Sequence, residues 1–83
     1  MPSSLMNKNV VVNGRRTSVR LEGEMWDALG EIARRERCTI HHICSDVESR
    51  RKASTFAAGL RVYIMSYYRE AADRVSRFRE ASP

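Results

Sequence analysis

The sequence predicts a mainly α-helical protein with a short β-ribbon near its N-terminus. Two patterns in its 83 residues indicate this class. Up to Leu21 apolar residues alternate with polar ones, which is typical of a strand, and from Gly23 onward they recur every three or four residues, which is typical of helices. A domain this small buries little surface and commonly depends on oligomerisation, a disulfide or a metal.

The strand is expected over residues 15–21. One face of this strand carries the more apolar residues Thr17, Val19 and Leu21. The opposite face carries the polar residues Arg16, Ser18 and Arg20. Just upstream, Asn13-Gly14 follows Val10-Val11-Val12, and Asn-Gly is a strong signal for a two-residue hairpin turn. We therefore favour a hairpin in which residues 10–12 form a second strand, with a flexible arm as the alternative. Residues 1–9 show no periodicity and are predicted to be a flexible tail.

Three helices are expected after the strand. The first covers Gly23–Glu36, and the second begins at Thr39 as its N-cap and ends at residue 51 or 52. A boundary at 53–55 follows, where Ser54 or Thr55 could cap the third helix. The apolar positions of this last helix are Phe56, Leu60, Ile64, Tyr67, Ala71, Val75 and Phe78, with Tyr63 beside them. The predicted division is thus a tail (1–9), a core (10–52) and a C-terminal helix (53–83).

The short strand predicts a homodimer. A lone strand leaves backbone groups unpaired, and even a hairpin is only marginally stable. Two chains could pair their strands antiparallel about a two-fold axis, with the helices beneath. The residues expected in the core of this dimer are Val19, Leu21, Trp26, Leu29, Ile32, Ile43 and Val47.

The composition favours a polyanionic partner. The net charge is +5, and thirteen of the fifteen basic residues are Arg, which suits bidentate contacts with phosphate and guanine. An anionic membrane fits the charge equally well, but the last helix mixes Glu70, Asp73 and Glu80 with its Arg residues, which disfavours a membrane surface.

Other classes of function have little support in the sequence. No paired-carboxylate pocket, nucleophile–base spacing or phosphate-binding loop is visible, so we do not expect an enzyme. Cys38, His41, His42 and Cys44 do not match the usual zinc spacing, and neither a metal nor a cofactor is expected. The two cysteines would close almost no loop as a disulfide. With no secretory signal or apolar run of membrane length, a reducing cytoplasm is the expected location.

These residues carry a family resemblance over about residues 14–52. Arg-Thr-Ser-Val-Arg-Leu-Glu, then Met25-Trp26-Asp27-Ala28-Leu29 and Glu31-Ile32-Ala33, then Thr39-Ile40 opening a helix with Ile43 and Val47, resembles the ribbon-helix-helix DNA-binding family. This family includes the Arc and methionine repressors and many plasmid antitoxins. The chain looks closest to a bacterial subgroup of small members, with a weaker similarity in Leu60-Arg61-Val62-Tyr63.

The resemblance implies a function and a set of site residues. Arg16, Ser18 and Arg20 would read base edges in the major groove, as a sequence-specific regulator of the repressor type does. The backbone amides of Thr39, Ile40 and His41 would hold a phosphate, and Arg15 would contact the DNA backbone. The alternative for the strand is an ordinary solvated face.

The chain departs from the family pattern in two places. Many relatives have Gly in the turn between the helices, where this chain has Arg37-Cys38, and the long third helix lies outside the minimal fold. That helix suggests a second hypothesis, an assembly or partner-binding module of the antitoxin-like or structural type. Residues 54–80 would then join dimers into a tetramer or larger assembly, or bind another protein.

Overall fold

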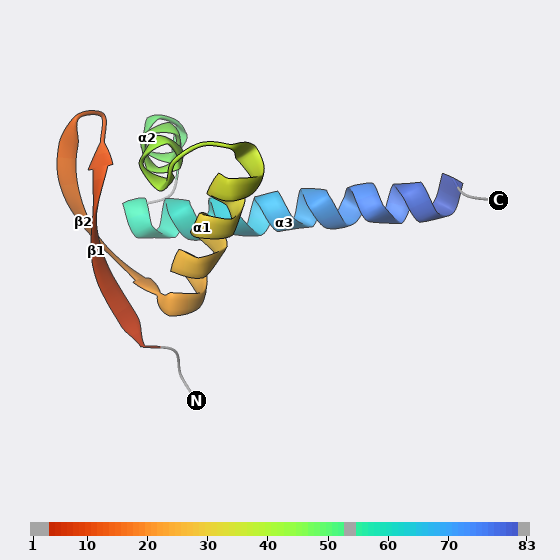
Figure 1. Ribbon diagram of the computed structural model, residues 1–83, viewed down its shortest axis with the longest axis horizontal. Coiled ribbons are helices and arrows are strands. Elements are labelled where there is room, and N and C mark those ends of the chain that lie inside the picture. The colour runs from red at the N-terminus through yellow and green to blue at the C-terminus, as the bar shows by residue number, and fades with distance from the viewer. Residues whose placement is uncertain (1–3, 53–54, 82–83) are drawn as a thin grey trace.

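The computed structural model describes residues 4–52 and 55–81. Two strands precede three helices, and their order and bounds are β1 (Leu5–Val12), β2 (Arg15–Glu22), α1 (Gly23–Glu36), α2 (Ile40–Arg50) and α3 (Phe56–Ala81) (Figure 1). The predicted class, a mainly helical protein with a short N-terminal ribbon and a long last helix, is confirmed. The second helix ends at Arg50, one residue before the earlier of its two predicted ends.

The N-terminal hairpin is confirmed and is longer than predicted. Asn13 and Gly14 have φ angles of 50° and 83°, as a type I′ turn requires, and β1 pairs with β2 from Val12↔Arg15 to Leu5↔Glu22. The prediction of a flexible tail over residues 1–9 is therefore wrong for residues 5–9. Pairing along the full length of β2 overrides the low strand propensity of Asn and Lys in this segment. Residues 1–3 lie outside the described part of the chain.

The core lies between one face of the hairpin and the three helices. All seven residues predicted for a dimer core are buried within one chain, with exposed fractions of 0–7%. Their contribution to a dimer interface remains a prediction. Leu60 and Ile64 of α3 belong to the same core, at 0% and 5% exposed. The core thus extends beyond residue 52 into α3.

Helix ends show how local sequence sets the boundaries. Thr39 caps α2, because its Oγ1 accepts a hydrogen bond from the His42 amide at 3.0 Å, as predicted. Thr55 caps α3 in the same way, accepting from the Ala58 amide at 3.0 Å, whereas Ser54 lies outside the described residues. After α1, Arg37 adopts a left-handed φ of 55°. This is a conformation that favours Gly, so the turn keeps the geometry of a glycine cap without the glycine.

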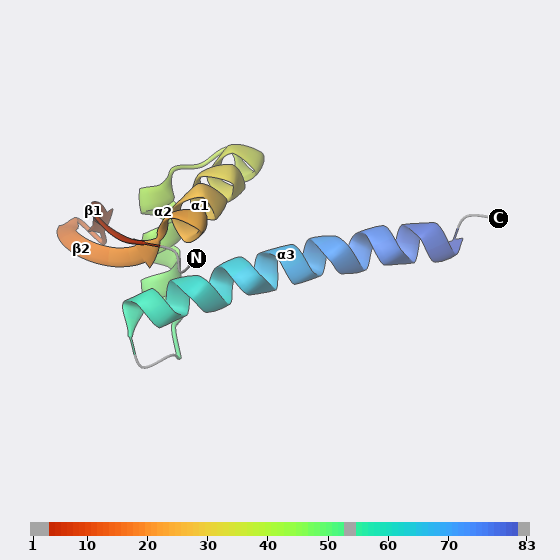
Figure 2. The ribbon, with the colours of Figure 1, turned by 90° about the horizontal axis from the view of Figure 1, so that it is seen from below.

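The third helix has a packed half and a projecting half. Arg61 is paired with Glu22 at 3.1 Å, and the Tyr67 hydroxyl donates to Glu36 Oε2 at 2.9 Å. A hydrogen bond from a backbone amide and, to a smaller extent, the hydrogen bond from Arg61 hold the pKa of Glu22 below its usual range. Tyr67 and Tyr68 still pack against the core, and the C-terminal part of the helix projects from the body of the molecule (Figures 1 and 2). There Val75 and Phe78 are 53% and 74% exposed.

Within the described residues, no helix has the length and apolar character needed to cross a membrane.

Candidate nucleic-acid interface

The hairpin turns one polar face away from the helices. Val19 and Leu21 point into the core, so the alternating residues Arg16, Ser18 and Arg20 point outward, and all three are exposed. By the same alternation, Arg15 lies on the face of Val19 and Leu21, but it is exposed because it is next to the turn. The structure thus brings the three predicted base-contacting residues together and separates Arg15 from them.

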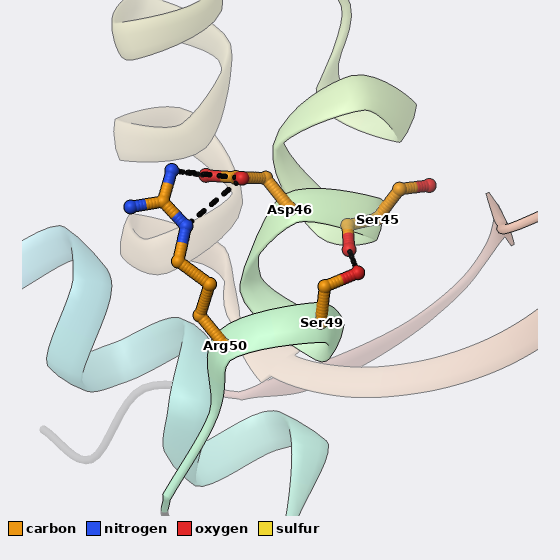
Figure 3. A network of polar contacts seen from close by, with 4 residues as sticks. All are labelled: Ser45, Asp46, Ser49 and Arg50. Carbon is orange, nitrogen blue, oxygen red and sulfur yellow. Dashed lines mark hydrogen bonds and ion pairs between the residues drawn. The ribbon is translucent and has the colours of Figure 1, made fainter.

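The two arginines of this face differ in their pairing from four other arginines of the chain. Arg35, Arg50, Arg51 and Arg61 each form an ion pair with a carboxylate at 2.8–3.1 Å. Figure 3 shows one such case, in which Asp46 holds the Arg50 guanidinium at the end of α2. Within the described part of the chain, no hydrogen bond or ion pair engages the side chains of Arg16 and Arg20. Their donors are available to a partner.

Two further polar residues join this face and are not among the site residues that the sequence predicts. Asn7 and Asn9 of β1 are exposed and lie opposite Arg20 and Ser18 in the register. The outer face therefore carries the polar residues Asn7, Asn9, Arg16, Ser18 and Arg20, together with the exposed apolar side chains of Leu5 and Val11. The sequence signal for these residues is the alternation Asn7-Lys8-Asn9. It places the two asparagines on one face only if this segment is a strand.

The two edges of the hairpin are in different situations. α2 covers the edge of β1: the Val11 amide donates to His41 Nδ1 at 2.9 Å, and the Asn13 amide donates to Ser45 Oγ at 3.0 Å. The described sheet has only two strands, so the far edge of β2 has no strand beside it. In a two-residue hairpin Val12 and Arg15 exchange hydrogen bonds, and the backbone groups of alternate β2 residues from Arg16 onward point to that far edge. An edge of this kind is a template for another strand.

The start of α2 lies beside the turn end of the hairpin. His41 bonds to Val11, and Val11 is the register partner of Arg16. The amides of the first helical turn have no partner within a helix. Thr39 satisfies the amide of His42, so the amides of Ile40 and His41 remain for an anion. The predicted phosphate-binding residues thus lie near Arg16, at the end of the outer face that is next to the hairpin turn.

A cluster of metal-binding side chains is not found. No group of three or more His, Cys, Asp and Glu residues in the described ranges could hold a metal ion. Cys44 is buried, and loss of solvent raises the pKa of its thiol to about 11, as for a thiol that serves in packing.

The geometry agrees with the comparison to known protein families. The sequence profile of the ribbon-helix-helix domain matches residues 5–68, which cover both strands, α1, α2 and the packed half of α3. The chain belongs to the ribbon-helix-helix family. Proteins of this family are generally DNA-binding regulators that bind DNA as dimers. The family fold is not an enzymatic one.

A solved structure has a similar fold. An uncharacterized protein from Bordetella pertussis Tohama I matches with a TM-score of 0.70 and 32% sequence identity. The match covers 86% of this chain and 61% of that one, so the chain spans less than two thirds of that protein's length. No curated protein sequence matches the chain.

Proposed function

We propose that this protein is a sequence-specific DNA-binding transcriptional regulator of the repressor type, which acts in the cytoplasm on the nucleoid. In this proposal two chains pair their β2 strands antiparallel about a two-fold axis, and the shared outer face enters the DNA major groove. The observation that carries it is the outer face itself. Arg16 and Arg20 are exposed, with no described partner, on a strand whose far edge is open.

Base reading follows from the residue types on β2. An Arg can bond to O6 and N7 of guanine bidentately, and a Ser can bond to either base type. The dimer would present Arg16, Ser18 and Arg20 twice, related by the two-fold axis. It should therefore prefer DNA sites with two-fold or repeated sequence.

Phosphate contacts would fix the register of the ribbon on the duplex. The amides of Thr39, Ile40 and His41 at the start of α2 would bind one phosphate in each half-site. Arg15 faces away from the groove floor, so its proposed contact is with the DNA backbone at the end of the ribbon. These contacts carry no sequence information directly.

Selection from a pool of genomic fragments tests this function. The purified chain is expected to behave as a dimer by light scattering, and to enrich fragments that share an inverted or direct repeat. Binding to the enriched site should weaken steeply with salt. Equal retention of all fragments would contradict sequence-specific binding, and retention of none would contradict DNA binding altogether.

A second candidate function is assembly of dimers through α3. Val62, Met65, Val75 and Phe78 of this helix are each more than half exposed, and its second half projects from the body (Figure 2). We infer that these side chains join dimers into a tetramer or larger assembly, or receive another protein. Replacing Val62, Met65, Val75 and Phe78 together by Ser leaves Leu60 and Ile64 in the core and should reduce the mass to that of a dimer. An unchanged mass with unchanged DNA binding would contradict this role.

A further inference from the structure

Asn7 and Asn9 place two side-chain amides on the outer face that have no role in the proposed base contacts. Both are exposed on the outer face, and no described hydrogen bond engages either side chain. Their partners across the hairpin are Arg20 and Ser18. Because the backbone groups of Arg20 and Ser18 point to the far edge of β2, these are non-hydrogen-bonded pairs, in which side chains lie closest together. Any surface that meets Ser18 and Arg20 therefore also meets the two asparagines.

The width of the major groove decides what Asn7 and Asn9 would meet. Neighbouring strands are about 4.8 Å apart, so β1 would lie about 7 Å from the two-fold axis of a sheet with two β2 strands at its centre. The major groove is about 12 Å wide, so its walls lie about 6 Å from its middle. The two β2 strands fit over the base edges, and each β1 strand falls at a wall, where the phosphates are.

We propose that Asn7 and Asn9 bind the phosphate backbone at the walls of the major groove, outside the bases read by Arg16, Ser18 and Arg20. The inference rests on the proposed function. The side-chain amide of Asn donates two hydrogen bonds, which suits a phosphate oxygen without adding charge. β1 is held in place for this contact at its turn end, because His41 accepts a hydrogen bond from the Val11 amide and Ser45 accepts one from the Asn13 amide in the turn. Such contacts would strengthen binding to every sequence and leave sequence preference to β2.

The test measures the affinity of the full chain for two duplexes of equal length, one with the selected site and one with its bases scrambled. For Asn7→Ala/Asn9→Ala we expect a roughly tenfold or larger loss on both duplexes, since hydrogen bonds to charged groups are among the stronger ones. The ratio of the two affinities should stay the same. The salt dependence should also stay the same, because no charged contact is removed.

A second pair of variants separates this contact from a general effect of charge or folding. Asn7→Asp/Asn9→Asp keeps the side-chain shape but places carboxylates against the phosphates, whereas Ser66→Asp/Ser76→Asp adds the same charge at exposed positions of α3. The first should lose far more affinity than the second, with both folded by circular dichroism. Equal losses, or no loss in Asn7→Ala/Asn9→Ala, would overturn the inference.

The failures of the two proposals are distinguishable. If Arg16→Ala/Arg20→Ala weakens binding but Asn7→Ala/Asn9→Ala does not, the phosphate contact is wrong and the regulator function stands. If the asparagine variant changes the ratio between the two duplexes, the asparagines read bases, and the inference is again overturned. If the unmodified chain binds neither duplex, both proposals fail.

Discussion

The substitution Leu60→Ala should destabilise the protein strongly, because α3 supplies part of the core. Leu60 is 0% exposed and lies in the same apolar cluster as Leu21, Leu29 and Ile32. Full burial of a Leu side chain contributes about 1.5–3 kcal/mol by transfer from water. With the cavity that remains, Leu→Ala in a core costs about 2–5 kcal/mol. We expect a loss of that size in the free energy of unfolding.

The chain offers the same substitution at an exposed position as a control. Leu5 is 47% exposed at the start of β1, so Leu5→Ala should cost at most about 1 kcal/mol. Urea unfolding followed by circular dichroism measures both variants. The protein concentration must be held constant, because the stability of a dimer depends on it. If Leu60→Ala costs no more than Leu5→Ala, then α3 is not part of the core, and the reasoning that joins it to the family domain is wrong.

Three other predictions concern single positions. Arg37→Gly should raise the free energy of unfolding by about 0.5–1 kcal/mol, since the left-handed φ of 55° strains any residue with a Cβ; a loss in urea unfolding would refute this. Thr39→Ala should cost about 1 kcal/mol by removing the cap on the His42 amide, and Thr39→Ser should recover most of it. Burial raises the pKa of Cys44 to about 11, so at pH 8 a thiol reagent should label Cys38 in the folded protein and reach Cys44 only after unfolding; equal labelling rates would contradict this.

Local patterns in the sequence were enough to predict the main elements. The alternation from Arg16 to Leu21 predicts β2 and both of its faces, and Asn13-Gly14 predicts the turn, because these signals depend on neighbouring residues alone. The Thr39 cap was predicted for the same reason.

What the sequence missed depends on contacts between distant segments. Asn7, Lys8 and Asn9 have low strand propensity and become a strand only by pairing with β2, which is why the local sequence predicts a tail there. The bond between Val11 and His41 joins positions 30 residues apart and has no local signal. The stripe on α3 was recognised, but periodicity cannot show that Leu60 is buried and Phe78 is exposed.

The central claim is that the outer face of β2 reads DNA sequence. Fluorescence anisotropy with the selected site and its scrambled duplex, at two salt concentrations, tests it on the unmodified chain, Arg16→Ala/Arg20→Ala and Arg74→Ala/Arg77→Ala. The last variant removes the same charge from exposed positions of α3. We predict that the β2 variant loses its preference for the site by tenfold or more, since a bidentate Arg–guanine pair discriminates by about 1–3 kcal/mol, while the α3 variant keeps its preference. If both variants lose affinity equally and keep their preference, the arginines of β2 act only as charge, and the ribbon does not read DNA.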